Sequence, residues 1–194
     1  RDLNKRRSLT HGLMVGLHET QVVGESIWVT STAIDAALKY SIHDATLEES
    51  IWPREMPEFQ QSLGLEPMDI DKGIDNRSNF LEQKTYRGSS HLHLNAVCEY
   101  QGDVYALLHS KSMVVNLSKG TIVIEDENLK HAHNLIIEEP GLAWINDTHR
   151  TVVRQYDLST GKQTREINIK KMRGIKPLLL RSAAHAIREM GVSF

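Results

Sequence analysis

Histidine is the residue type whose number and spacing could support chemistry, because the sequence holds ten histidines in 194 residues. His91 and His93 are two residues apart, and so are His131 and His133. Residues two apart on a β-strand project from the same face, so each pair could hold one ion between its imidazoles. Neutral imidazoles bind zinc, iron, copper and nickel, and such a metal can polarise a carbonyl or activate water. The histidines therefore make a divalent transition metal the candidate cofactor.

Three of the histidines, His18, His93 and His133, occupy equivalent positions of an internal repeat. Each is followed by an aromatic residue of its own repeat, after 10, 12 and 11 residues respectively. If the repeats stand side by side around an axis, three imidazoles converge there. We therefore predict these three side chains as metal ligands, with His91 and His131 as further candidates.

Three polar residues close to these histidines, Glu19, Asn95 and Asn134, are the candidate ligand-binding residues. Glu19 and Asn95 could also orient a metal ligand or transfer a proton. Two other interpretations stay open. Each histidine could instead donate a hydrogen bond to a backbone carbonyl of the next repeat and so lock the repeats together, or the histidines could be independent surface residues.

The repeat itself appears when the sequence is compared with itself at an offset of 116 residues. Residues 27–32 (IWVTST) align with 143–148 (AWINDT), and 35–40 (DAALKY) align without a gap with 151–156 (TVVRQY). Trp, Thr and Tyr recur at the same places. Repeats at a fixed spacing indicate a fold built from stacked units.

A second copy lies between these two, since His91-Leu92-His93 and His131-Ala132-His133 are 40 residues apart. It contains four runs rich in β-branched or aromatic residues, at 94–100, 104–108, 113–117 and 121–124, separated by Gly, Ser and Lys turns. Four antiparallel strands in about 40 residues is the unit of a β-propeller blade. An ordinary β-sandwich is the alternative, but it has no reason to repeat the Trp, Thr and Tyr pattern.

At this point the chain resembles the propeller proteins of the strictosidine-synthase-like, NHL-repeat and virginiamycin-lyase-like group. The resemblance rests on residues 93–97 (HLNAV), 102–105 (GDVY) and 156–162 (YDLSTGK), and it covers about 11–43 and 91–170. It looks closest to uncharacterised bacterial members whose blades begin with His. These motifs imply an architecture and leave the activity open.

We therefore expect an all-β protein, in which residues 1–194 form a single propeller-type domain or part of one. Its segments are blade 1 at about 11–43, an insertion at about 44–88, blade 2 at about 91–128, blade 3 at about 131–170, and a partial blade or terminal helix at 171–194. Three or four blades leave a propeller ring incomplete. Either the chain is a fragment or identical chains complete the ring as a homo-oligomer.

The insertion is predicted to be partly helical. Thr46 and Glu49 form a capping box, which predicts a short helix that ends before Pro53. A second short helix is predicted from Pro57 to Leu63, because proline is favoured at the start of a helix and glycine just beyond its end. Long insertions in rigid β scaffolds often carry binding residues, so we expect this one to cover one end of the channel.

Composition narrows the classes of partner. A net charge of −2 and a pI near 6.6 give no footprint for nucleic acid or an anionic membrane, and no stretch is apolar enough to span a bilayer. The single cysteine, Cys98, lies in an apolar run and is expected to be a buried structural thiol. One cysteine cannot form an internal disulfide, which favours a reducing, cytoplasmic compartment.

Two functions follow from these residues. The first is a non-catalytic propeller module that binds a small ligand or a protein partner at the mouth of the channel. The alternative is a metal-dependent lyase or hydrolase that uses the channel histidines. The sequence names no substrate for either.

Overall fold

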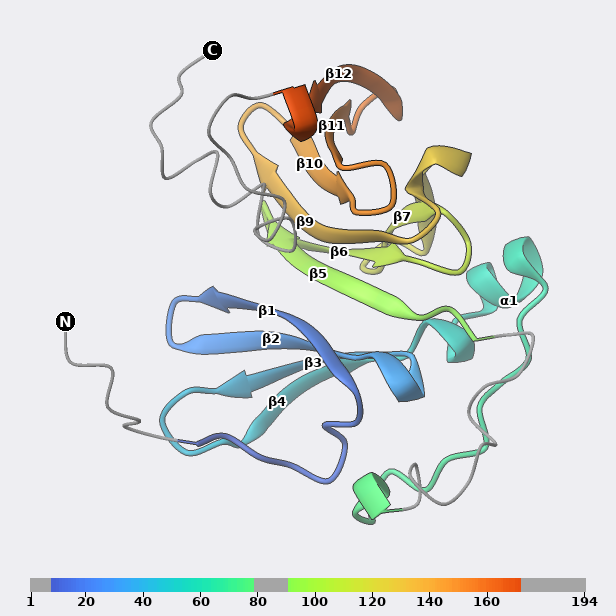
Figure 1. The fold of residues 1–194 in the computed structure, drawn as a ribbon. Coiled ribbons are helices and arrows are strands. Elements are labelled where there is room, and N and C mark those ends of the chain that lie inside the picture. The colour runs from blue at the N-terminus through green and yellow to red at the C-terminus, as the bar shows by residue number, and fades with distance from the viewer. Residues whose placement is uncertain (1–7, 79–90, 172–194) are drawn as a thin grey trace, which may run out of the picture.

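The computed structural model describes residues 8–78 and 91–171, whose strands form three antiparallel sheets of four strands each (Figure 1). The first sheet contains β1 (Leu17–Val23), β2 (Ser26–Ser31), β3 (Ala36–Ser41) and β4 (Leu47–Ile51). The second contains β5 (Leu94–Tyr100), β6 (Asp103–Leu108), β7 (Met113–Asn116) and β8 (Thr121–Glu125). The third contains β9 (Ala132–Glu138), β10 (Leu142–Asp147), β11 (Val152–Asp157) and β12 (Lys162–Asn168).

Each sheet is one unit of the predicted repeat, with its strands paired in chain order. The outermost strands β4, β8 and β12 each carry one extra residue against their partner strand, at Glu48, Val123 and Thr164. Such shared irregularities are features of a repeated unit and not local accidents. The arrangement is all-β and propeller-like, as predicted, and the described residues do not form a closed ring.

The three innermost strands, β1, β5 and β9, lie side by side across the middle of the molecule (Figure 1). No strand of one sheet is paired with a strand of another among the described residues, so the sheets are held together by side chains. The first strands therefore face one another, as the propeller arrangement requires. Residues at equivalent places on them are brought close together.

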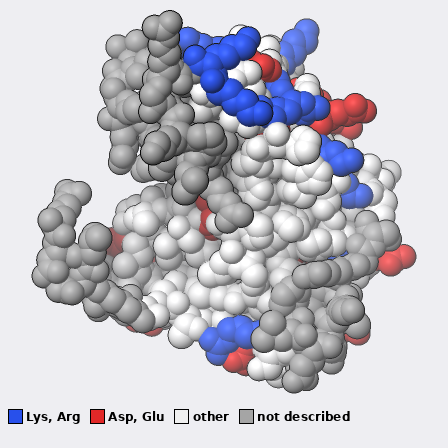
Figure 2. Space-filling view, in the orientation of Figure 1, with Lys and Arg blue, Asp and Glu red and all other residues white. Residues whose placement is uncertain are grey.

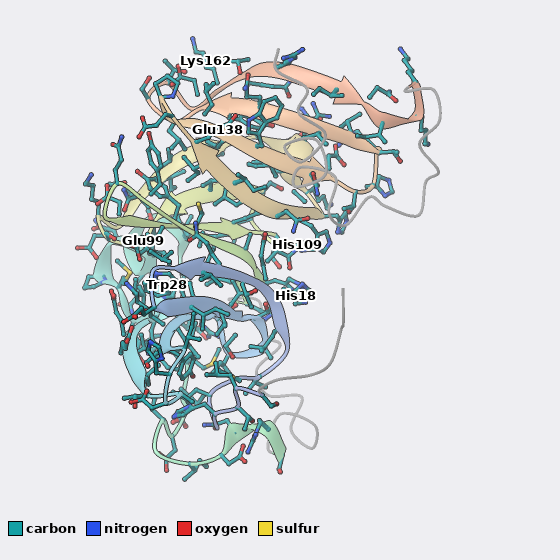
Figure 3. The ribbon with its side chains drawn as sticks, turned by 90° about the vertical axis from the view of Figure 1, so that its left-hand side faces the viewer. His18, Trp28, Glu99, His109, Glu138 and Lys162 are labelled. Carbon is teal, nitrogen blue, oxygen red and sulfur yellow. The ribbon has the colours of Figure 1, made fainter. Side chains whose placement is uncertain are left out.

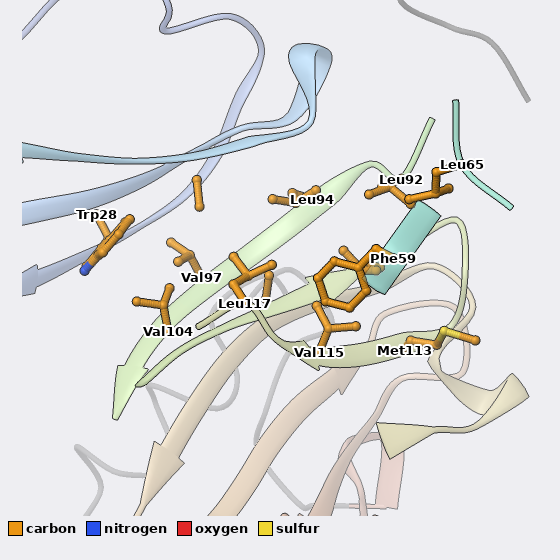
Figure 4. Packing of buried hydrophobic residues seen from close by; sticks show 13 residues of the cluster. Trp28, Phe59, Leu65, Leu92, Leu94, Val97, Val104, Met113, Val115 and Leu117 are labelled. Atoms are coloured by element: carbon orange, nitrogen blue, oxygen red, sulfur yellow. The ribbon is translucent and has the colours of Figure 1, made fainter. Parts of the chain in front are cut away.

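A buried apolar cluster fills the space between the first and second sheets (Figure 4). Trp28 is fully buried there, and it packs with Ala37 of β3 and with Leu94 and Val97 of β5. Burying one large apolar side chain contributes roughly 2–3 kcal/mol. A second cluster joins the second and third sheets, and a third covers the opposite face of the first sheet.

Two polar joints fix the first sheet against the second. The indole Nε1 of Trp28 donates to Glu99 at 2.7 Å, and the Nζ atom of Lys39 approaches the same carboxylate at 3.1 Å (Figure 3). At the other joint, the buried Asp35 carboxylate accepts from the backbone N–H groups of Leu92 and His93 at 3.0 and 2.9 Å. Charge-assisted bonds of this kind are stronger than neutral ones, so they define how the two sheets meet.

The helix predicted at Thr46 is wrong, because residues 47–51 form β4 and pair with β3. The local capping signal loses to strand pairing, in which the half-buried Leu47 and Ile51 pack against the sheet. The first sheet therefore continues into the segment that we assigned to the insertion. The amide of Thr46 is instead held by the Asp44 carboxylate at 3.0 Å, in a turn.

The second predicted helix is confirmed as α1 (Pro57–Leu63), which ends at Gly64 in a left-handed conformation. Short 3₁₀ turns occur at Thr32–Ile34, Pro53–Glu55, Glu127–Leu129 and Ile169–Lys171. Phe59 of α1 is fully buried and packs with Val115 and Leu117 of the second sheet (Figure 4). This part of the insertion thus contributes to the core between two sheets. The predicted partial blade or helix at 171–194 lies, beyond Lys171, outside the described residues.

The surface bears on the predictions made from composition. Across residues 8–78 and 91–171, no helix is long and apolar enough to cross a membrane. Lys and Arg side chains gather at the top of the view, over the third sheet, while the middle is largely uncharged (Figure 2). Cys98 is buried, as predicted, and its burial raises the pKa of the thiol to about 11.

Candidate functional site

The candidate site is built by a bulge that recurs in the first strand of every sheet. Relative to its partner strand, β1 has one extra residue between Leu17 and Thr20, and β5 has one at Asn95. In β9 the extra residue is Asn134, which adopts a left-handed conformation. A bulge turns a side chain away from the alternation of its strand. Three bulges at one level therefore aim polar residues, including Glu19, toward a common space.

The histidines gather at the same level. The ring centroid of His18 lies 4.9 Å from that of His93 and 6.0 Å from that of His133. The structure therefore brings the three predicted imidazoles together, but their places in the repeat are not all equivalent. His133 pairs with Asn146 inside the third sheet. His93 instead precedes β5 in a left-handed conformation, which is the place that His131 occupies before β9.

Two further histidines that sequence reasoning missed, His109 and His149, join this group. The ring of His109 lies 4.5 Å from that of His93 and 4.9 Å from that of His131, while His149 lies 6.1 Å from His131 (Figure 3). The repeat alignment contains a signal that could have identified His109. If Tyr105 is aligned with Trp28, His109 falls on Thr32, directly after the second strand of its unit.

His91 has the structural role that we considered as an alternative. Its Nε2 atom lies 2.9 Å from the backbone carbonyl of Thr32 in the first sheet, and 3.5 Å from the Asp35 carboxylate. A protonated Nε2 donates to that carbonyl, so the imidazole ties the second sheet to the first. His131 instead faces the Nε2 of His109 at 3.1 Å.

The cluster is neutral in its middle at physiological pH. Burial, followed by the neighbouring imidazoles, lowers the pKa of His93 to about 3. The same causes lower the pKa of His109 to about 4. Adding a proton to either ring would place a charge among close neighbours with little water around it, so both rings stay neutral at pH 7.

Asparagine side chains connect the three bulges by hydrogen bonds. The side-chain amide of Asn134 in the third sheet donates to the Glu19 carboxyl of the first at 3.0 Å. The side-chain oxygen of Asn134 accepts from the amide of Asn146 at 2.8 Å. The Asn95 amide donates to the backbone carbonyl of Ala132 at 2.8 Å. Glu19 and Asn134 are 115 residues apart, so this bond crosses directly from the first sheet to the third.

Two hollows open at this level. The smaller, of about 280 Å³, is lined by Leu17, His18, Asn95, His133 and Asn134. The larger, of about 610 Å³, runs between β1 and β9 over Val97 and Cys98 of β5. Both are lined by His18 and Asn134, and the larger also by Glu19. No residue of the described part of the insertion, up to residue 78, lines either hollow, so its expected cover over one end of the channel stays a prediction.

Glu19 is the acidic group of the site, and burial raises the pKa of its carboxyl to about 7. Hydrogen bonds from the Asn134 amide and the Leu135 backbone oppose that effect without cancelling it. Its Oε2 and the Oδ1 of Asn95 are buried and have no hydrogen-bond partner among the described residues. Buried acceptors without a partner are rare in proteins, so these two oxygens call for an explanation.

The arrangement of the histidines bears on the predicted metal site. Within the described ranges, no group of three or more His, Cys, Asp or Glu side chains is placed to hold a metal ion. The imidazoles are close together without forming such a group. The metal assignment of His18, His93, His133, His91 and His131 therefore stays a prediction, and we derive no chemical step through a metal.

Comparison with known proteins assigns the chain to no family. No protein-family model and no curated protein matches the sequence. One similar solved structure is a catalytically inactive virginiamycin B lyase from Staphylococcus aureus with quinupristin, at 10% identity and a TM-score of 0.47 over 80% of this chain and 42% of the lyase. Another is the computationally designed protein Ika8, at 8% identity and a TM-score of 0.44 over 78% of this chain and 36% of that protein. The chain thus spans about two fifths of these structures.

Proposed function

We propose that the chain is a non-catalytic binding module of the propeller group that its blade motifs resemble. It binds a small polar ligand in the hollows where the bulges of β1, β5 and β9 meet. The observation that carries the proposal is the side chain of Asn95, which is only 1% exposed and lines the smaller hollow. Its amide is used within the protein, while its Oδ1 has no partner among the described residues. A ligand that donates to this oxygen would offset the cost of burying it.

The rigid way in which the site is held together supports a binding function. All three sheets contribute residues, and the hydrogen bond from Asn134 to Glu19 fixes the first strand relative to the third. A rigid scaffold of this kind holds a ligand with little loss of conformational entropy. The hollow of about 280 Å³ is near the lower limit for small-molecule sites, which suits a small ligand.

The test is a titration of ¹⁵N-labelled protein with a set of small polar fragments, followed by two-dimensional amide spectra. We expect the side-chain amide signals of Asn95 and Asn134 to shift together with backbone signals of β1, β5 and β9. Replacing His18 by Ala should weaken binding, because this exposed ring stands at the mouth of the hollow. His43→Ala is the matched control, since His43 lies in the turn after β3 with its side chain 69% exposed. Shifts confined to other surfaces would contradict the proposal.

The metal-dependent alternative rests on the same histidines and has its own test. It predicts that dialysed protein retains a transition metal in a fixed ratio, and that the double variant His93→Ala, His133→Ala abolishes this. Elemental analysis of both proteins decides the matter. A metal content that the double variant leaves unchanged would exclude these ligands.

A further inference from the structure

We infer that the ligand of this site carries a guanidinium group. The inference rests on the proposed binding function and adds the chemical class of the ligand. Four features support it: the hydrogen-bonding capacity that the protein leaves unused, the charge of the lining residues, their flat faces, and the separation of the acceptors between two sheets.

Two acceptor oxygens of the site are left without a partner among the described residues. The Asn95 amide already donates to Ala132, at 2.8 Å, and lies 3.3 Å from the Nδ1 of His133. The Asn134 amide donates to Glu19, and the oxygen of Asn134 accepts from Asn146. What remains buried at this level without a partner, among the described residues, includes Oδ1 of Asn95 and Oε2 of Glu19. A ligand that satisfies both must donate hydrogen bonds.

The two acceptors come from different sheets, Asn95 from β5 and Glu19 from β1. A single N–H or O–H group cannot serve both. Asn95 lines the smaller hollow and Glu19 the larger, and the two hollows share His18 and Asn134. A guanidinium has five N–H donors that spread in one plane, so one group held between the hollows can donate to both oxygens. A compact ammonium has three donors on one nitrogen and is held more strongly by water.

The charge of the lining favours a cation. No Lys or Arg side chain is among the described residues that line either hollow, whereas the Glu19 side chain lines the larger one. The Glu19 carboxyl therefore has no fixed positive partner in the lining of the site. A bound cation would supply that partner.

The shape of the walls favours a planar cation. The rings of His18 and His133 line the smaller hollow, are within 11° of parallel, and have centroids 6.0 Å apart. A planar group in contact with both rings needs about 7 Å between the ring planes, from contact distances of about 3.5 Å on each side. The planes are no farther apart than the centroids, so the exposed ring of His18 must move outward by at least about 1 Å to admit the group. Guanidinium groups stack on aromatic faces in this way, whereas ammonium groups have no plane to stack.

The experiment compares methylguanidinium, methylammonium and methylurea by isothermal titration calorimetry at pH 8. Methylurea has a similar planar shape without the charge. We expect methylguanidinium to bind about tenfold more tightly than either, because hydrogen bonds to charged groups are stronger than neutral ones. The variant Glu19→Gln should lose about tenfold in affinity, while His43→Gln should lose none.

The results separate this inference from the proposed function. Equal binding of methylurea, or unchanged binding to Glu19→Gln, would overturn the guanidinium assignment. If neutral fragments shift the Asn95 signals and methylguanidinium does not, the site binds ligands of another class and only the inference fails. If no fragment binds in the hollows, both fail. The guanidinium group could belong to an arginine of a protein partner or to a small molecule, and a blocked tripeptide with one central arginine distinguishes the two. Tighter binding of the peptide than of methylguanidinium indicates a protein partner. Similar binding indicates a small molecule.

Discussion

Replacing Glu19 by Gln should change how the stability of the protein depends on pH. The carboxyl of Glu19 has its pKa raised by burial from 4.5 to about 7. The folded protein therefore holds a proton that the unfolded chain releases above pH 4.5. The contribution of Glu19 to stability is complete below pH 4.5, declines as the pH rises toward 7, and then stays constant. Gln does not titrate, so this decline disappears in the variant.

The magnitude follows from the same pKa. A rise from 4.5 to about 7 corresponds to a cost of about 3 kcal/mol for holding Glu19 ionised in the fold above pH 7. The side-chain amide introduced by Glu19→Gln leaves one buried donor in place of Oε2, which costs about 1–3 kcal/mol at every pH. We therefore expect the variant to gain about 3 kcal/mol relative to the wild type between pH 4.5 and pH 8. The absolute difference at one pH is less informative.

The assay is urea unfolding followed by tryptophan fluorescence at a series of pH values from 4.5 to 8.5. Glu25→Gln is the control, because Glu25 lies in the turn after β1 with its side chain 84% exposed. The free energy of unfolding of this control should change with pH in the same way as that of the wild type. If the Glu19→Gln variant and the wild type also remain parallel across the whole range, the carboxyl is not buried as described and the reasoning is refuted.

Other predictions concern the histidines and the joints between sheets. Burial lowers the pKa of His93 to about 3 and of His109 to about 4. Their contribution to the free energy of unfolding is therefore complete above pH 6.5 and is lost as the pH falls. Replacing both by Gln should make the free energy of unfolding fall less steeply between pH 6.5 and pH 5 in urea titrations. Gly161 has a φ of 67°, and an added Cβ would lie 2.5 Å from a backbone oxygen of β8. Gly161→Ala should therefore lower the free energy of thermal unfolding by about 2–4 kcal/mol. Gly102 also has a positive φ but open space around it, so Gly102→Ala should lower it by only about 1–2 kcal/mol. Asp35→Asn should cost about 2 kcal/mol in urea unfolding, because one of two buried backbone N–H groups at the start of the second sheet loses its acceptor; wild-type stability would refute that joint.

The blade repeat could be predicted from the sequence because its recurring tyrosine is fully buried in both copies that the alignment joins, and its tryptophan is fully buried in the first. Trp28 and Tyr40 recur as Trp144 and Tyr156, and both tyrosines are fully buried at equivalent places. Side chains that fill a core are constrained in type, so their spacing survives even where the strands between them differ. The spacing of histidines from the next aromatic residue also predicted that His18, His93 and His133 lie close together, although His93 occupies the place of His131 in its unit.

Other parts of the fold and site could not be predicted from local patterns. The capping signal at Thr46 was outweighed by pairing of β4 with β3, which no local window of sequence reveals. The bulges that place Asn95 and Asn134 depend on the register between two strands, and the sequence of one strand does not specify it. His109 was missed because it lies after a second strand and not at the start of a unit. Its proximity to His93 arises only when the sheets pack together.

The central claim is that three equivalent bulges form one site for a small polar ligand. The most direct measurement is a crystal structure of the protein soaked with small hydrogen-bond-donating fragments. We expect a fragment between His18 and His133 that donates to the Oδ1 of Asn95. Fragments that bind only elsewhere, while this hollow stays without one in a crystal where it is open to solvent, would contradict the claim.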